Sequence, residues 1–307
     1  MAAPLAPTPP ALSVLLPERR RFAGQPVGVE TGKILARADR PADGEPGERA
    51  QLLRHFDLLP RGWPMAAITR QRDAGDAALH QWLRADPAHV RADMTGARVL
   101  AIGELGLSHE DAQALLAPLR PLFGDLGFQL SAPEPSRWYV AMPVEARLPA
   151  FSPPEVVLGD DLFSHLPDGP EGRRWRALLN EAQVTLHNHP VNQARVAAGK
   201  PAVNSLCFWG AGRLPDHVRT PYTGLASQEA ELVSLAQLAG IGNSADGPQL
   251  LDLRQARDWS AVEHRLLPGL RELGSAQVQL DFGDGARFRL KASQRWRFLR
   301  RPLASLA

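Results

Sequence analysis

Residues 171–212 decide the fold class of this chain: EGRRWRALLNEAQVTLHNHPVNQARVAAGKPAVNSLCFWGAG. In the first half, apolar residues recur with a period near 3.6, which predicts a helix over residues 171–187: Trp175, Leu178, Leu179, Ala182 and Leu186. The apolar run 205–209 then predicts a buried strand, which leads into Gly210-Ala211-Gly212. A helix that returns into a buried strand is the repeating unit of α/β proteins.

The alternation of strands and helices continues on both sides of this stretch. Apolar runs predict strands over residues 12–16, 90–94, 97–102, 128–130, 138–142 and 250–253. Helical stripes predict helices over residues 52–59, 77–83, 108–123, 228–238 and 261–273. Ser108 followed by Asp111 is typical of a capped helix start. Residues 24–47 are rich in Gly, Pro and Asp, which predicts an irregular connection.

The C-terminal part contains a predicted β-hairpin. Apolar and polar residues alternate over residues 278–282 and again over 288–290, with Gly283-Asp284-Gly285 between them. Asp281 and Asp284 flank this turn and are interpreted as turn residues.

These patterns predict a mixed α/β sheet flanked by helices, with the hairpin as its C-terminal element. Residues 1–10 are dominated by Pro and Ala and are expected to be disordered. Residues 11–307 are expected to form one mixed α/β domain, with a C-terminal α/β extension over residues 250–300.

Composition narrows the classes of function. Lys plus Arg number 35 and Asp plus Glu number 33, so the net charge of +2 gives no general attraction to nucleic acid. The single cysteine, Cys207, lies in an apolar run and excludes an intramolecular disulfide. No run of about 18 apolar residues occurs, and Arg19-Arg20-Arg21 follows the first apolar stretch, which is the wrong order for a signal peptide. We therefore expect no membrane partner and a cytoplasmic location.

Two segments are dense in directed polar groups, and the first surrounds residue 90. On a strand, His89, Arg91 and Asp93 share one face because side chains alternate with period two. An imidazole and a guanidinium on one face could bind an anionic ligand. An internal Arg–Asp pair on a half-exposed strand explains the same pattern, so both interpretations stay open.

The second segment carries His187, His189, Asn192, Arg195 and Asn204. Pro190 suits the first position of a new helix, which would place Asn192 and Arg195 on one face near the positive helix end that favours anions. The spacing of the two histidines does not match the i, i+4 zinc pair of a helix. A polar network that fixes the turn between two helices is the competing interpretation.

The second segment resembles that of a known enzyme family. His189-Pro190-Val191-Asn192, Arg195, Gly199-Lys200-Pro201, Asn204 and Trp209-Gly210-Ala211-Gly212 are similar to a stretch of archaeal-type cofactor-independent phosphoglycerate mutases. The resemblance covers roughly residues 77–240, the mutase-like middle of the chain. The same combination resembles a proteobacterial family named phosphoglycerate mutase-like or regulator of pathogenicity factors, and the chain is identified as a member of that family.

The resemblance implies a reduced form of the alkaline phosphatase superfamily fold. It also implies two divalent metals, held by an Asp-Gly-x-x-Asp start after the first strand and by Asp/His clusters near the C-terminus, and a serine nucleophile. Here Pro17-Glu18-Arg19 follows the first strand, and His217 and His264 stand outside Asp/His clusters. Because the implied ligands are not matched, we expect no metal cofactor. Phosphoryl transfer depends on such cations, so an inherited pocket without them could bind a ligand but would hardly turn it over.

Three hypotheses follow, and they leave open whether the chain is an enzyme. The favoured one is a non-catalytic mutase-like protein that retains a surface for a small phosphorylated ligand or a regulatory partner. The first alternative is an active phosphoglycerate mutase or phosphatase with a rearranged Mn²⁺ or Mg²⁺ site, for which His187, His189, Asp86 and Asp93 are the candidate ligands. The second is a nucleic-acid or protein interaction module that uses Trp296 among basic residues: Lys291, Arg295, Arg297, Arg300 and Arg301.

Overall fold

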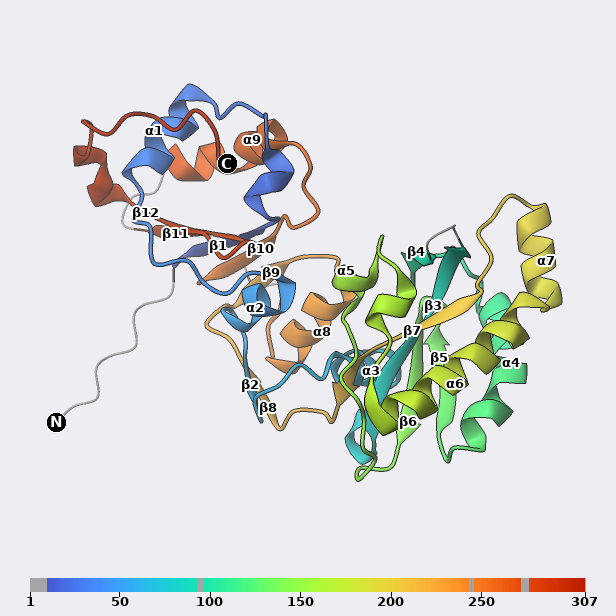
Figure 1. The fold of residues 1–307 in the computed structure, drawn as a ribbon. Coiled ribbons are helices and arrows are strands. Elements are labelled where there is room, and N and C mark those ends of the chain that lie inside the picture. Colours follow the sequence, from blue (N-terminus) through green and yellow to red (C-terminus); the bar gives the residue numbers. More distant parts are fainter. Residues whose placement is uncertain (1–9, 93–95, 243, 245, 272–275, 307) are drawn as a thin grey trace. The chain divides into compact units, whose positions relative to one another are not determined.

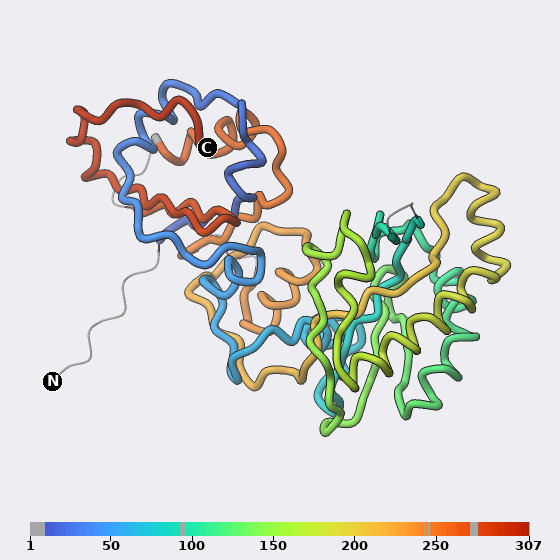
Figure 2. Tube along the Cα trace, in the orientation of Figure 1, coloured from blue at the N-terminus to red at the C-terminus, as the bar shows by residue number. Residues whose placement is uncertain are grey.

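The structure is a computed structural model that describes residues 10–92, 96–242, 244, 246–271 and 276–306. It divides the chain into two compact units: unit 1 consists of Met1–Leu59 with His217–Ala307, and unit 2 of Pro60–Asp216. Figure 2 shows this composition by colour, since blue and orange-to-red segments build unit 1 and cyan-to-yellow segments build unit 2.

The structure thus differs from the prediction of one domain over residues 11–307. The reason is that residues 60–216 enclose a hydrophobic core of their own, while the two flanking segments share another. Residues 1–10, for which disorder is expected, lie outside the described residues except for Pro10.

Unit 1 is built on a five-stranded sheet in the order β12-β11-β1-β10-β9 (Figure 1). The central strand β1 pairs in parallel with β10 and β11, β9 pairs in parallel with β10, and β12 is antiparallel to β11. The strands are β1 (Leu12–Leu16), β9 (Gly224–Ala226), β10 (Gln249–Asp252), β11 (Gln277–Phe282) and β12 (Arg287–Lys291). The predicted first strand and C-terminal hairpin are confirmed.

The helices of unit 1 supply the rest of its core. They are η1 (Arg19–Phe22), α1 (Val29–Arg37), α2 (Glu48–Leu53), α8 (Ala230–Leu238), α9 (Trp259–Arg271) and η4 (Ala292–Trp296). Leu35 of α1 and Trp259 of α9 pack with Val14, Leu16 and Leu280 of the sheet, so both helices cover one of its faces. Two short strands, β2 (Asp57–Leu59) and β8 (His217–Arg219), pair with each other in a separate antiparallel sheet.

Unit 2 contains an antiparallel sheet centred on a long strand, β3 (Gln81–Ala92). β3 pairs with β4, β6 and β7, and β5 pairs with β6. The other strands are β4 (Ala97–Ile102), β5 (Gln129–Glu134), β6 (Arg137–Met142) and β7 (Ser205–Gly212). The helices are α3 (Met65–Ala74), η2 (Ala77–Leu79), α4 (His109–Gly124), α5 (Pro154–Val157), η3 (Leu162–His165), α6 (Gly169–His187) and α7 (Pro190–Ala197).

Helices cover both faces of the sheet in unit 2 (Figure 1). Leu83 and Ala85 of β3 face the core that α4 and α6 complete, whereas Trp82 faces Ala66 and Ala67 of α3. The predicted start of α4 is confirmed, because the Ser108 hydroxyl accepts from Asp111 N at 3.0 Å. With its sheets flanked by helices in both units, the chain has the mixed α/β class that the sequence predicts.

Three predicted elements are wrong. Residues 77–83 do not form an α-helix, because residues 77–79 form the short helix η2 and residues 81–83 begin the strand β3. Residues 52–59 are divided between α2 and β2. The region 24–47 contains α1 and is not irregular throughout. In β3 both faces are buried, so the apolar pattern loses its period of two and resembles a short helix.

No helix among the described residues combines the length and apolar character that a membrane span requires.

Candidate functional site

The side chain of Asn192 on α7 forms hydrogen bonds with backbone groups of its own unit. Its Nδ2 donates to the carbonyl oxygens of Leu186 and Val203, each at 2.7 Å, and its Oδ1 accepts from Val203 N at 2.8 Å. The residue is buried. Its amide therefore joins the end of α6 to the chain that enters β7, and three of its hydrogen-bonding positions are taken.

Arg195, one turn further along α7, has the same kind of environment. Its guanidinium donates to the carbonyl oxygens of Leu105 at 2.5 Å, Gly106 at 3.3 Å and Pro201 at 3.1 Å. It also lies 3.6 Å from a carboxylate oxygen of Asp111. A buried guanidinium that joins two loops in this way, the one before α4 and the one before β7, acts as a scaffold group.

Asn204 and His89 join β3 to the chain before β7. Asn204 Oδ1 accepts from Val90 N at 2.8 Å and its Nδ2 donates to Val90 O at 2.7 Å, so the side chain pairs with β3 like a strand residue. His89 Nδ1 lies 2.8 Å from the carbonyl oxygen of Ala202. Asn192 and His89 therefore both contact the connection between α7 and β7, and Asn204 is part of that connection.

The remaining predicted site residues are distributed differently. Arg91 is exposed on β3, and His187 is exposed at the end of α6. His189 caps α7, because its Nδ1 accepts from Val191 N at 3.2 Å. Asp93 lies outside the described residues. A β-bulge between His89 and Val90 interrupts the alternation on which the predicted shared face depends.

Asp86, a candidate ligand of the alternative metal site, is buried in unit 2. Its carboxylate accepts from Arg84 Nε at 2.8 Å and from Trp209 Nε1 at 2.6 Å. The Arg84 guanidinium lies 4.9 Å from the centre of the Trp209 ring and 5.3 Å from that of Tyr139. This carboxylate thus belongs to a buried cation–π cluster.

Unit 1 holds a second polar cluster, at the carboxyl edge of its parallel strands. Asp281 on β11 is completely buried and accepts from Arg54 Nε at 2.9 Å and Arg54 Nη2 at 2.7 Å. Its Oδ2 also lies 3.0 Å from His55 Nε2. The interpretation of Asp281 as a turn residue is wrong, because its side chain faces inward from the strand toward the chain after α2. Asp284, in contrast, does cap the turn by accepting from Ala286 N.

The cluster continues from His55 into the sheet. His55 Nδ1 lies 2.7 Å from the Tyr222 hydroxyl, which donates to Ser13 Oγ on β1 at 2.8 Å. Burial raises the pKa of Tyr222 to about 12. The groups from Asp281 through His55 and Tyr222 to Ser13 are all buried, and only Arg54 is partly exposed.

A second carboxylate at this edge is also paired with an arginine. Asp252, the last residue of β10, accepts from Arg254 Nε at 2.8 Å and Nη2 at 2.9 Å, and from Ser227 Oγ at 2.8 Å. Arg254 also pairs with Glu48. Burial alone would raise the pKa of Asp252, but the hydrogen bonds and charge of Arg254 outweigh burial and lower it.

The carboxyl edge of parallel strands is where α/β proteins place ligands, so its carboxylates are the ones to compare with the divalent metals that the resemblance implies. The donor set does not fit them. Asp281 and Asp252 are both engaged by guanidinium groups that carry the positive charge a metal would supply. Among the residues that the structure describes, no three His, Cys, Asp or Glu side chains are grouped so that they could hold a metal ion.

The polar groups at the carboxyl edge of the unit 1 sheet were predictable from the sequence only in part. Asp252 and Asp281 stand near the ends of predicted strands, and that position is a recognisable signal for a site. Arg54 and His55 precede Asp281 by more than 220 residues, so the sequence gives no indication that they meet it.

Cys207 lies on a small apolar cavity of about 30 Å³ in unit 2. Phe151, Leu162 and Phe208 are among the residues that line the cavity with it. Burial raises the pKa of the Cys207 thiol, so the reactive thiolate is disfavoured. The thiol behaves as the small hydrophobe that the sequence predicts.

No family model matches this chain. Among curated proteins, the 2,3-bisphosphoglycerate-independent phosphoglycerate mutase of Methanosarcina barkeri is 34% identical over 92 residues, which cover 30% of this chain and 23% of that protein. The probable enzyme of the same name from Geobacter sulfurreducens is 34% identical over 85 residues, 26% of this chain and 21% of that protein. That of Methanothrix thermoacetophila is 32% identical over 130 residues, 41% and 32% of the two chains.

Two solved structures align with most of this chain. The cofactor-independent phosphoglycerate mutase of Thermoplasma acidophilum gives a TM-score of 0.42 at 14% identity, over 92% of this chain and 90% of that one. A protein from Pyrococcus horikoshii gives 0.47 at 11% identity, over 92% and 87%. The sequence matches span 21% to 32% of the three curated relatives. A segment of this chain is therefore similar in sequence to 2,3-bisphosphoglycerate-independent phosphoglycerate mutases.

Proposed function

We propose that this chain is a non-catalytic protein on a phosphoglycerate-mutase-like scaffold and that it acts as a binding or regulatory module. The observation that carries the proposal is the pairing of buried carboxylates with arginines at the carboxyl edge of unit 1: Asp281 with Arg54 and Asp252 with Arg254. Phosphoryl transfer needs cations that neutralise charge on the transferred group. Carboxylates that already neutralise guanidinium groups cannot also hold such cations without breaking buried ion pairs.

A small phosphorylated metabolite is the ligand that the sequence similarity favours. The side chains of Asn192, Arg195 and Asn204 form hydrogen bonds with backbone groups. The ligand would therefore contact other residues of the site that the sequence predicts. Among these, exposed Arg91 supplies the guanidinium that phosphate recognition prefers. Membership in the proteobacterial mutase-like family and a cytoplasmic location belong to the same proposal.

The absence of mutase activity is the first test. The purified full chain, supplied with Mn²⁺ or Mg²⁺, is expected to convert no 3-phosphoglycerate in an assay coupled to enolase, because the carboxylates needed for metal binding are paired. Metal analysis of the same preparation is expected to give a substoichiometric content. An active cofactor-independent mutase serves as the positive control. Turnover that disappears with EDTA and returns with Mn²⁺ would instead establish the metal-dependent alternative.

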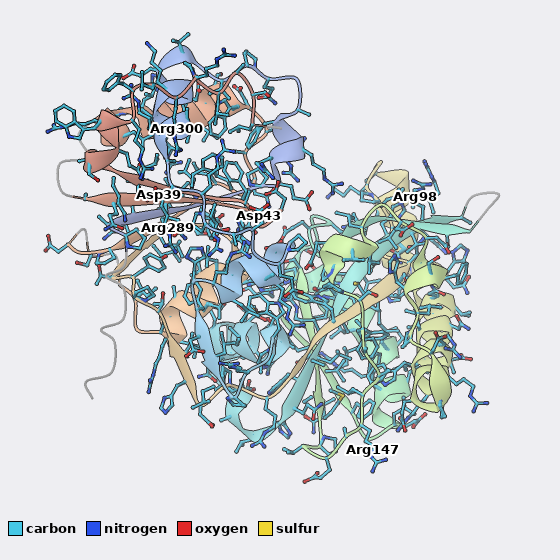
Figure 3. The ribbon with its side chains drawn as sticks, turned by 60° about the vertical axis from the view of Figure 1, so that its left-hand side comes forward. Asp39, Asp43, Arg98, Arg147, Arg289 and Arg300 are labelled. Atoms are coloured by element: carbon cyan, nitrogen blue, oxygen red, sulfur yellow. The ribbon has the colours of Figure 1, made fainter. Side chains whose placement is uncertain are left out.

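Ligand binding is tested by thermal unfolding in the presence of 3-phosphoglycerate and other phosphorylated metabolites. A ligand at 100 times its Kd should stabilise the folded chain by about 2.7 kcal/mol. The Arg91→Gln variant is expected to lose most of this stabilisation, because the exposed guanidinium is the proposed phosphate contact. Arg147→Gln, which removes another exposed arginine of unit 2, is the matched control and should behave like the wild type (Figure 3). Equal stabilisation of both variants would remove Arg91 from the proposal.

A further inference from the structure

A segment of unit 1 that the proposed function does not use combines positive charge with exposed apolar side chains. It covers residues 291–301, KASQRWRFLRR, and we call it the arginine–aromatic segment. It contains no acidic residue and five basic ones: Lys291, Arg295, Arg297, Arg300 and Arg301. Three large apolar side chains in it are unusually accessible, since Trp296 is 71%, Phe298 65% and Leu299 88% exposed.

The segment is fixed to unit 1 at its start. Gln294 is buried in η4; its Oε1 accepts from Lys291 N at 3.1 Å and its Nε2 donates to Arg289 O at 3.0 Å. These two hydrogen bonds join η4 to the end of β12. The exposed side chains that follow are therefore presented from an anchored backbone.

Two arginines fix the segment further along. Arg297 Nη1 donates to the Asp39 carboxylate at 2.6 Å and to Arg37 O at 2.9 Å, and Arg300 Nη1 donates to Ala36 O at 3.2 Å. These acceptors lie at the C-terminal end of α1 or just after it, where positive charge is favourable. Figure 3 labels Arg300 and Asp39 in this part of unit 1.

The chain that follows the segment also lies close to α1. Leu303 N donates to Gly32 O at 3.1 Å, and a Cβ at Gly32 would lie only 2.3 Å from the Leu303 carbonyl oxygen. Glycine at position 32 is thus required for this close approach. The backbone on both sides of Trp296, Phe298 and Leu299 is held, so their exposure is part of the folded structure.

We propose that the arginine–aromatic segment binds the surface of an anionic lipid bilayer. A bilayer interface provides an apolar layer for Trp296, Phe298 and Leu299 and negatively charged headgroups for arginines beside them. Arg295 and Arg301 are exposed and flank the three apolar side chains. Peripheral binding of this kind needs no membrane-spanning helix, so it departs from the expectation of no membrane partner without requiring a span.

The distribution of apolar surface favours lipid over nucleic acid. Single-stranded nucleic acids stack on the faces of aromatic rings. Leu299, the most exposed side chain of the three, has no such face, and the Arg295 guanidinium already lies 5.1 Å from the centre of the Trp296 ring. Aliphatic and aromatic side chains next to each other match the interfacial layer of a bilayer instead.

Co-flotation of the full chain with vesicles tests the proposal. Vesicles of phosphatidylcholine with phosphatidylglycerol are expected to bind the wild-type chain, and vesicles of phosphatidylcholine alone are expected to bind it at least about tenfold more weakly. The triple variant Trp296→Ser/Phe298→Ser/Leu299→Ser should bind the anionic vesicles at least about tenfold more weakly than the wild type. Arg295→Gln/Arg301→Gln should show a similar loss and a weaker dependence on salt.

Matched controls test whether vesicle binding depends on the arginine–aromatic segment or on any exposed apolar or basic side chain of unit 1. Leu59→Ser removes an apolar side chain that is 56% exposed, and Arg49→Gln/Arg257→Gln removes two exposed arginines elsewhere; all should bind like the wild type. Thermal unfolding confirms that each variant folds. The proposal is overturned if the wild type does not float with anionic vesicles. It is equally overturned if the controls lose as much binding as the segment variants, or if single-stranded oligonucleotides bind through this segment while vesicles do not.

Discussion

Replacing Asp281 by alanine is expected to lower the free energy of unfolding of unit 1 by about 3–5 kcal/mol. The Asp281 carboxylate is completely buried and accepts two hydrogen bonds from Arg54, with His55 beside it. Its removal leaves a guanidinium without its partner in a largely buried position, which is the costly way to break such a pair. Urea unfolding followed by hydrogen exchange of peptides from β1 and β11 measures the loss in unit 1.

Asp284→Ala is the matched control for this substitution. Asp284 stands three residues later, at the hairpin turn, and pairs with Arg19 at 2.7 Å on a partly exposed surface. Its loss should cost no more than about 1 kcal/mol. If the Asp281→Ala chain does not fold, Asp281→Asn preserves the shape and should still be clearly less stable than the control. Equal effects at the two positions would contradict the assignment of Asp281 to a buried ion pair.

The same pair predicts how the stability of unit 1 responds to acid. Burial alone would raise the pKa of Asp281, but the hydrogen bonds from His55 and Arg54 outweigh burial and lower it. Because the folded pKa lies below the unfolded value of about 3.9, the pair stabilises unit 1 above that pH. This contribution disappears as the pH falls through the folded pKa, so the difference in stability between wild type and Asp281→Asn should shrink in that range.

The second large effect is expected at Asn192, in unit 2. Asn192→Ala should lower the free energy of unfolding of unit 2 by about 3 kcal/mol, because three buried backbone groups lose their partner. These groups are Leu186 O, Val203 O and Val203 N. Thermal and urea unfolding of the full chain, with hydrogen exchange of peptides from α6 and β7, measures the change.

Asn188→Ala provides the comparison for Asn192. Asn188 is exposed at the end of α6 and donates one hydrogen bond, to Val184 O at 3.1 Å. Its replacement should cost no more than about 1 kcal/mol. Should Asn192→Ala prevent folding, Asn192→Ser retains one small polar group that can bond a backbone partner and should be destabilised less. An Asn192→Ala chain as stable as Asn188→Ala would mean that the side chain is available to a ligand.

Local elements were predictable where one property of the sequence dominates. The capped start of α4 at Ser108, the long stripe of α6 and the alternation of the C-terminal hairpin all reproduce the expected structure, because each depends on residues close in sequence. The error at residues 77–83 has a different origin. Trp82, Leu83 and Arg84 are all buried because β3 is covered on both faces, and burial on both faces removes the period that identifies a strand.

The candidate site illustrates the same limit for side chains. The sequence places Asn192, Arg195 and Asn204 in one polar stretch, but it does not indicate whether their groups face a ligand or a backbone carbonyl. In the structure, all three side chains donate hydrogen bonds to backbone carbonyl oxygens. Both interpretations use the same residue types, because a carbonyl oxygen and a phosphate oxygen accept hydrogen bonds from the same donors.

The order of residues along the chain was enough to predict the α/β class, most of the long helices and strands, and the resemblance of the middle of the chain to phosphoglycerate mutases. These properties depend on periodicity and on residues that are close in sequence. Three further properties follow from the folded arrangement: Arg54 neutralises Asp281, Arg254 neutralises Asp252, and the chain forms two units. Packing brings Arg54 and Asp281 together across more than 220 residues, and electrostatics then decides whether a carboxylate holds a metal or an arginine.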